Sequence, residues 1–330
     1  MRFGDYRVLD RIAEGGMGLI FRGQDVRSGG LVAIKTVCSR REVDAAAIRR
    51  EIVALSNLRH PGIVRLHTFG EEGGAPWIAL ELLEGRTLGD EILWYGPETS
   101  MGADERRERT DELPTTPARG LGAPARGLRD QRSAPAPAFP LAAGGHLRDV
   151  ISIVAQICLA LDHVHRAGLV HRDVKPANVF LGDDGRTTLI DFGLACAAAT
   201  TRENEVGVGT MEYAAPEQIC GGPVDRRADI YSLGCVLYEL VTGRLPFSGD
   251  SANEIAERQI KREPVAPTML SAEVPGQLDD LVMSMLAKSP AHRPDNITEV
   301  GWRLANIARR LAQRPLICVE HPEPRLRQAG

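Results

Sequence analysis

The chain has 330 residues, of which 43% are hydrophobic and 25% are charged, and its formal net charge is -4. This composition is typical of a soluble globular protein, and the near-neutral charge argues against a general attraction to nucleic acid or to membrane surfaces. The most apolar long segment, residues 150–164, is too short and too amphipathic to cross a bilayer. The six cysteines are scattered without a C-x-x-C pair, so we expect reduced thiols in the cytoplasm rather than a zinc site.

Strands dominate the pattern from residue 6 to about residue 83. The runs rich in β-branched and apolar residues, which predict strands, are residues 19–25, 31–37, 62–69 and 77–83. One helix interrupts them over residues 43–58, where apolar side chains recur at every third or fourth position. This part of the chain is therefore expected to form a small β-rich lobe with a single helix.

The composition changes between residues 97 and 144. This segment is rich in proline, alanine and glycine, and it has few large apolar residues. Because it cannot bury enough surface to offset the entropy of ordering, we expect an insertion that is mostly disordered. Two interpretations stay open. The insertion is either a mobile loop that contacts substrates or partners, or an insertion without a role, which a fold tolerates because long surface loops add little closure entropy.

The second half of the chain is predicted to be mainly helical. Helical periodicity returns at His146 and stops at Gly168. A hairpin that turns at residues 182–185 follows, and the strongly apolar segment 229–243 predicts a buried helix. The expected architecture is α+β with two lobes, of which the second is larger and mainly helical.

The stretch "HRDVKPAN", residues 171–178, carries the strongest chemical signal. The carboxylate of Asp173 can accept a proton from a hydroxyl group, Lys175 can neutralise a phosphate group in transfer, and Asn178 can hold a metal ion. Asp191 begins "DFG" at the end of the predicted hairpin, where a carboxylate suits Mg²⁺. Together these residues predict phosphoryl transfer.

The order of the motifs resembles that of eukaryotic-type serine/threonine protein kinases, which are also common in bacteria. The motifs are "VAIK" at 32–35, "HRDVKPAN" at 171–178, "DFG" at 191–193, "APE" at 215–217, "DIYSLG" at 229–234 and "HRP" at 292–294. The resemblance implies a two-lobed protein kinase domain over residues 6–312, interrupted by the insertion at 97–144 and followed by a tail at 313–330. Its N-lobe would end at about residue 83 and its C-lobe begin at about residue 84. It also implies ATP and Mg²⁺ as cofactors, and proteins with serine or threonine as substrates.

The resemblance assigns the roles in phosphoryl transfer residue by residue. Lys35 is expected to contact the α- and β-phosphates of ATP and to pair with Glu51 on the predicted helix. Asp173 is expected to orient and deprotonate the substrate hydroxyl, while Lys175 contacts the γ-phosphate. The magnesium ligands are expected to be Asn178 and Asp191.

The glycine-rich stretch "RIAEGGMGLIF", residues 11–21, is expected to cover the phosphates of ATP. Gly15 and Gly18 fill the second and third glycine positions of the family motif, and Ala13 stands at the first. We expect this alanine to change nucleotide affinity only modestly. The residues of the loop that are expected to contact the nucleotide are Ile12, Ala13, Glu14, Gly15, Gly16, Met17, Gly18, Leu19 and Ile20.

The resemblance also implies a site for the adenine ring. The apolar side chains expected to enclose the ring are those of Ile12, Ile20, Ala33 and Phe180. The backbone from Glu81 to Leu83, between the lobes, is expected to supply hydrogen bonds to adenine. Leu80 is expected to guard the back of this pocket.

Two features favour serine and threonine as the acceptors, since "KPAN" and Thr210 both resemble the serine/threonine kinase pattern. The adjacent Thr200 and Thr201 fall in the expected activation segment, residues 191–217. Two interpretations of this pair stay open. In one, their autophosphorylation orders the segment through Arg172, and in the other they are ordinary polar loop residues.

Three further expectations concern residues that hold the site in place. Glu217 and Arg293 are expected to form a buried ion pair in the larger lobe. Asp229 is expected to hold the backbone of the catalytic loop. His171 is expected to pack beneath Phe192.

Two other functions compete with the kinase interpretation. A pseudokinase would use the same fold as a binding or scaffold module, but the four residues it would be expected to lack are present, Lys35, Asp173, Asn178 and Asp191. A small-molecule phosphotransferase of related fold is opposed by "APE" and "DIYSLG", which resemble features that serve protein substrates. A homodimer that supports autophosphorylation is left open.

Overall fold

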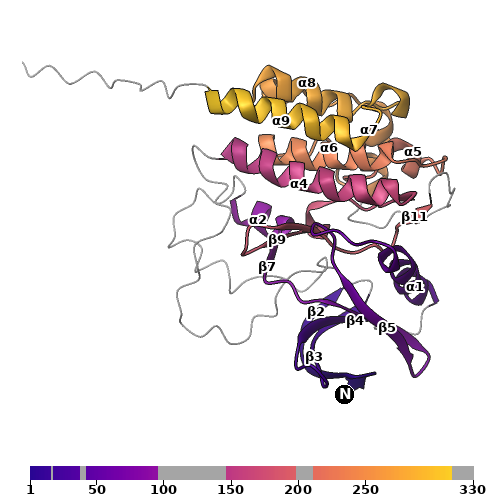
Figure 1. Ribbon diagram of the computed structural model, residues 1–330. Helices are drawn as coiled ribbons and strands as arrows, with labels where there is room; N and C mark the ends of the chain where they lie inside the picture. Colours follow the sequence, from indigo (N-terminus) through magenta and orange to yellow (C-terminus); the bar gives the residue numbers. More distant parts are fainter. Residues whose placement is uncertain (16–17, 38–41, 96–145, 198–210, 314–330) are drawn as a thin grey trace, which may run out of the picture.

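The computed structural model describes residues 1–15, 18–37, 42–95, 146–197 and 211–313. Within these ranges, a strand-rich lobe and a helical lobe stack on each other, as Figure 1 shows. The two-lobed α+β architecture expected from the sequence is therefore confirmed. The sequence-based predictions that fall outside the described residues concern Gly16, Met17, the insertion at 97–144, Thr200, Thr201, Thr210 and the tail at 313–330 except for its first residue.

The first lobe is built on an antiparallel sheet of six strands in the order β1-β2-β3-β4-β6-β5. Its strands are β1 (Arg2–Phe3), β2 (Tyr6–Gly15), β3 (Gly18–Asp25), β4 (Leu31–Thr36), β5 (Leu66–Glu72) and β6 (Ala75–Glu81). Helix α1 (Glu42–Ser56) packs on this sheet with Ile48 and Leu55 fully buried. The same buried face of α1 carries Glu51.

One strand starts later than the sequence predicts. The expected strand at residues 62–69 begins only at Leu66. The backbone before it pairs elsewhere, because the N–H of Val64 donates to the carbonyl of Leu189 (3.0 Å) and the N–H of Leu189 donates to the carbonyl of Gly62 (2.8 Å). These hydrogen bonds tie the first lobe to a hairpin of the second.

The second lobe is mainly helical. Its helices are α2 (Leu88–Tyr95), α4 (His146–Arg166), α5 (Pro216–Ile219), α6 (Arg227–Thr242), α7 (Ala252–Lys261), α8 (Gly276–Met285) and α9 (Ile297–Gln313). Its short strands are β7 (Gly85–Thr87), β8 (Leu169–Val170), β9 (Val179–Gly182), β10 (Thr187–Leu189) and β11 (Cys196–Ala197). Three single turns of 3-10 helix, η2 (Pro176–Asn178), η3 (Pro267–Met269) and η4 (Pro290–His292), join them. None of the helices in the described ranges is both long and apolar enough to span a membrane.

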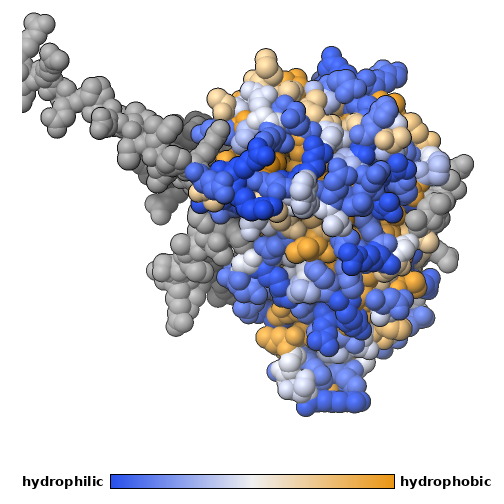
Figure 2. Space-filling model, turned by 45° about the horizontal axis from the view of Figure 1, so that its top comes forward, coloured by the Kyte–Doolittle hydropathy of each residue, from blue (hydrophilic) through white to orange (hydrophobic). Residues whose placement is uncertain are grey.

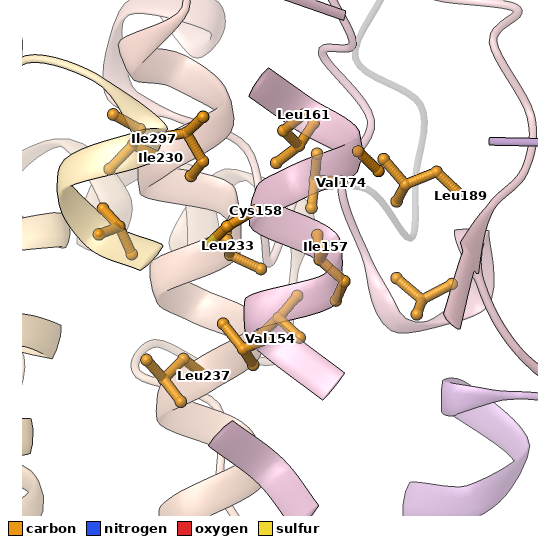
Figure 3. Packing of buried hydrophobic residues seen from close by; sticks show 14 of the residues in the cluster. Val154, Ile157, Cys158, Leu161, Val174, Leu189, Ile230, Leu233, Leu237 and Ile297 are labelled. Carbon is orange, nitrogen blue, oxygen red and sulfur yellow. The ribbon is translucent and has the colours of Figure 1, made fainter. Parts of the chain in front are cut away.

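The helices α4 and α6 form the centre of the larger core. Figure 3 shows Val154 and Cys158 on the side of α4 that faces α6, which carries Leu233 and Leu237, and the side chains of Val154, Leu233 and Leu237 are fully buried. Each such side chain contributes about 1.5–3 kcal/mol through removal of its surface from water. The apolar segment predicted to be a buried helix is thus α6, and α4 and α8 pack against it (Figure 1).

The outer surface differs from this core. On the face drawn in Figure 2, hydrophilic side chains predominate and apolar ones appear in small, separate groups. Such scattered apolar exposure is ordinary for a globular protein.

A buried ion pair fastens the far end of the helical lobe, as predicted. The guanidinium of Arg293 donates to both carboxylate oxygens of Glu217, at 2.7 and 2.8 Å. It also donates to the carbonyls of Ala287 (2.8 Å), Lys288 (3.0 Å) and Arg227 (2.9 Å). Because the Arg293 side chain is 0% exposed, these five acceptors replace all of its contacts with water.

Arg293→Met is expected to lower the free energy of unfolding by about 3–5 kcal/mol, because it leaves the Glu217 carboxylate buried without its counter-charge. Urea unfolding followed by tryptophan fluorescence measures this loss. The control is Arg309→Met, which removes an exposed guanidinium from α9. A loss no larger than that of the control would contradict the structural role of the pair.

Candidate active site

The catalytic loop follows β8 and is held by a buried carboxylate of α6. Asp229 is 0% exposed and accepts hydrogen bonds from the backbone N–H groups of His171 (2.9 Å) and Arg172 (2.8 Å). The ring of His165 contributes a third hydrogen bond at 2.8 Å. Burial alone would raise the pKa of Asp229, but the hydrogen bond and charge of His165 and the backbone amides outweigh it and lower the pKa below its usual value. The expected role of Asp229 is confirmed.

These hydrogen bonds hold the loop in a strained conformation. Arg172 has φ of 67°, in the left-handed region, which costs a residue with a side chain about 1–2 kcal/mol. The side-chain amide of Gln218, on α5, donates to the carbonyl of Arg172 at 3.0 Å. The carboxylate and this amide therefore fix both peptide groups of the strained residue.

The next residue in the loop is Asp173, which is 3% exposed. Its Oδ2 accepts from Lys175 Nζ (2.9 Å) and from Asn178 Nδ2 (2.8 Å). Asn178 Nδ2 donates in addition to the carbonyl of Asp173 at 2.9 Å. Within the described ranges, Oδ1 of Asp173 is buried and has no hydrogen-bond partner. A carboxylate oxygen in this situation is ready to accept a proton or a hydroxyl donor.

His171 supports this aspartate from below, as predicted. Its ring lies 4.6 Å from the ring of Phe192, and its Nδ1 accepts the N–H of Asp173 at 3.3 Å. Burial lowers the pKa of His171, which favours the neutral ring that this hydrogen bond requires.

A second cluster joins β4, α1 and the "DFG" segment. Lys35 Nζ lies 2.7 Å from Glu51 Oε2 and 3.0 Å from Asp191 Oδ1, and all three side chains are buried. Burial opposes the charge of the ammonium, but the carboxylates of Asp191 and Glu51 outweigh this effect and raise the pKa of Lys35. Burial raises the pKa of Glu51, whereas Lys35 overcomes burial at Asp191 and lowers its pKa.

The "DFG" backbone is shaped around Asp191, which has φ of 64°. The N–H of Gly193 donates to Asp191 Oδ1 at 3.2 Å, and Arg50 Nε donates to the carbonyl of Gly193 at 2.8 Å. The N–H of Phe192 approaches Glu51 Oε1 at 3.4 Å. Neighbouring residues of α1 thus hold this segment by two separate contacts.

The residues available for a metal ion are few. Across the described part of the chain, no group of three or more His, Cys, Asp or Glu side chains gathers to hold one. Asn178 and Asp191 offer oxygen donors, and the amide nitrogen of Asn178 is already engaged with Asp173. This sparse set fits Mg²⁺, which usually binds one or two carboxylates and completes its coordination with phosphates and water.

The glycine-rich bend lies at the end of β2 and the start of β3, where Gly15 pairs with Gly18. A side chain at Gly18 is excluded, because its Cβ would lie 2.1 Å from the carbonyl oxygen of Thr36. Ala13 is buried and pairs with Ile20, next to an irregularity in the register of β2 and β3. The remaining described residues of the loop are half-buried at Ile12, Leu19 and Ile20 and exposed at Glu14.

The residues expected around adenine lie on adjoining strands. Ala33 of β4 pairs with Leu80 of β6, and Phe180 lies on β9. Leu80 is buried, whereas Ala33, Phe180, Glu81 and Leu83 are half-buried. Among the described residues, the backbone of Leu83 makes no hydrogen bond, so its N–H and carbonyl are available to a ligand.

The structure thus brings the predicted catalytic and magnesium residues into two clusters, Asp173 with Lys175 and Asn178 and Lys35 with Glu51 and Asp191, and the contact of His171 with Phe192 joins them. Sequence reasoning missed Arg50, Gln218 and His165. Their contacts span between 46 and 143 positions of the chain, and no motif around them signals the contact.

The chain matches the family described as "Protein kinase domain" over residues 6–111 and 144–302. The interruption falls inside the insertion expected at 97–144. The chain is 34% identical over 312 residues to the serine/threonine-protein kinase PknL of Mycobacterium tuberculosis strain H37Rv, covering 93% of this chain and 66% of that protein. It is 32% identical over 313 residues to PknB of Mycolicibacterium smegmatis, covering 92% of this chain and 43% of that protein. With its motifs, fold and site in agreement with these matches, the chain belongs to the protein kinase domain family.

Proposed function

We propose that the chain is a serine/threonine protein kinase that transfers the γ-phosphoryl group of ATP to hydroxyl groups of proteins. The observation that carries this proposal is the buried ion cluster of Lys35, Glu51 and Asp191 beside Asp173, whose Oδ1 is a buried acceptor without a partner in the described ranges. A protein kinase requires these two units together, one for the nucleotide and one for the hydroxyl.

The nucleotide would lie between the two lobes. In this proposal Lys35 contacts the α- and β-phosphates, and Glu51 holds the ammonium in position. Mg²⁺ would be held by Asn178 and Asp191, where it would neutralise charge on the phosphate oxygens. The backbone from Gly15 to Gly18 and the apolar side chains of the adenine site would cover the rest of the nucleotide.

The acceptor hydroxyl would lie against Asp173. Its free oxygen, Oδ1, would accept the hydroxyl hydrogen and orient the hydroxyl oxygen toward the γ-phosphorus. Lys175, fixed 2.9 Å from Oδ2, would stabilise negative charge on the transferred group. The "KPAN" sequence supports serine and threonine as acceptors.

The remaining assignments are proposals of the same kind. We place the kinase domain at residues 6–312, with lobes that meet near residue 84 and an insertion at 97–144, and we place the protein in the cytoplasm. Phosphorylation of Thr200 or Thr201, with Arg172 as the phosphate ligand, stays a prediction, as does a homodimer. A pseudokinase remains the alternative. The Asp173→Asn variant distinguishes the two functions, because only an active kinase would lose phosphate transfer.

Asp173→Asn is expected to reduce phosphate incorporation from labelled ATP by about 10²–10⁴-fold, because an amide cannot accept the hydroxyl proton. ATP affinity, measured by titration calorimetry with Mg²⁺, should change little. The control is Asp183→Asn at an exposed position of the β9–β10 turn. Equal incorporation by both variants would exclude Asp173 as the proton acceptor.

Glu51→Gln is expected to reduce kcat/KM for ATP by about tenfold or more, equivalent to about 1.4 kcal/mol, because it removes one of the two charges that position Lys35. The control is Glu257→Gln, which neutralises one partner of the exposed pair with Lys261. Surface pairs contribute little, so this variant should behave as the unchanged protein. If both variants keep full kcat/KM, the buried pair does not position the nucleotide.

Ala13→Gly is expected to shift KM for ATP only a few-fold, a change of about 1 kcal/mol. The reason is that the alanine removes some backbone freedom from the bend but already fits within the paired strands. Steady-state kinetics over a range of ATP concentrations measures the shift. A hundredfold change would mean that the methyl group governs how the loop closes over phosphate.

A further inference from the structure

A hollow of about 310 Å³ opens where four separate segments meet. These segments are the turn after α1, the start of β5, the end of β6 and the turn between β9 and β10. Leu58 and Ile63, both almost completely buried, line its apolar part. The charged residues that line it are Arg59, Arg65, Arg186 and Glu81. The functional proposal above uses none of these arginines.

The hollow carries surplus positive charge, because three guanidinium groups face one lining carboxylate. Glu81 partly neutralises Arg186, with a carboxylate oxygen 3.7 Å from its guanidinium. Asp184, which does not line the hollow, lies at the same distance from the guanidinium of Arg186. His60 also lines the hollow, but burial lowers its pKa, so its ring adds little charge at neutral pH.

The other two arginines are held without being neutralised. Arg59 donates to the carbonyls of Leu55 (3.2 Å) and Leu58 (2.9 Å) at the end of α1, and carbonyl groups satisfy a guanidinium without cancelling its charge. Arg65 is exposed, and its backbone N–H donates to Glu81 at 3.1 Å. Within the described ranges, the guanidinium of Arg65 has no hydrogen bond and no ion pair.

We propose that this hollow docks an acidic segment of a partner protein. Carboxylates of the segment pair with Arg65 and Arg59, and an apolar side chain between them covers Leu58 and Ile63. Complementary charge supports this occupant, since the site presents two arginines that no carboxylate in the described ranges neutralises. A single phosphate group is a poorer fit, because it is much smaller than the hollow and cannot cover the apolar part.

Fluorescence anisotropy with the full chain tests the proposal. The probe is a fluorescein-labelled peptide, Gly-Asp-Glu-Leu-Glu-Asp-Gly, and its counterpart replaces every acid by the amide. Arg65→Glu is expected to weaken binding of the acidic peptide by about tenfold or more, because it replaces an attraction by a repulsion. The control, Arg309→Glu on α9, makes the same change in net charge at another exposed arginine.

The expected result is binding of the acidic peptide that weakens as salt is added, survives in Arg309→Glu and Arg65→Lys, and weakens by about tenfold or more in Arg65→Glu. Circular dichroism confirms that each variant is folded. The proposal is overturned if the acidic peptide does not bind, if both glutamate variants weaken it equally, or if the neutral peptide binds as well. Displacement of the peptide by inorganic phosphate alone would overturn it too, in favour of a small oxyanion. All of these readouts are independent of kinase activity.

Discussion

The site depends on one constraint, which is the burial of Lys35 between two carboxylates. Removing an ammonium from water costs several kcal/mol, and only close, well-oriented counter-charges repay it. Glu51 and Asp191 approach to 2.7 and 3.0 Å, so β4, α1 and the "DFG" segment must all be in place for the lysine to be charged while it is buried. The cluster carries one net negative charge when all three groups are ionised. Further positive charge beside Asp191 would therefore be stabilising, which agrees with a divalent cation in the proposed mechanism.

The second constraint is backbone strain. Arg172 and Asp191 are the two residues other than glycine that have positive φ in the described ranges, and they flank the two halves of the site. Groups on other elements help to hold each of them. Asp229 fixes the first from within α6, and Gly193 and α1 fix the second. Because α6 carries Asp229 and is the buried centre of the helical lobe, the packing shown in Figure 3 fixes the position of the catalytic loop.

The sequence predicted the parts of this arrangement that local motifs encode. Lys35, Asp229 and Arg293 lie inside such motifs, whereas Glu51 was assigned as the partner of Lys35 from the family resemblance and its place on the helix predicted at 43–58. Long-range contacts were not predictable in this way. The backbone before Leu66 pairs with Leu189, more than a hundred positions later, and no alternation of apolar residues can signal that choice. The arginines of the hollow come from three segments, so only the folded chain shows that they share a surface.

A buried oxygen without a hydrogen-bond partner indicates a functional site only when the groups around it support that interpretation. Glu91 and Glu212 also bury an oxygen that has no hydrogen-bond partner in the described ranges, so this feature alone does not identify a site. Burial raises the pKa of Glu91, and a protonated oxygen loses much of the cost of being unpaired. At Asp173 the other carboxylate oxygen, Oδ2, is held by the ammonium of Lys175 and the side-chain amide of Asn178, which orient the carboxylate. Oδ1 thus has no hydrogen-bond partner in the described ranges, although the other oxygen of the same carboxylate is held in place, and this is the arrangement expected where an incoming hydroxyl completes the set.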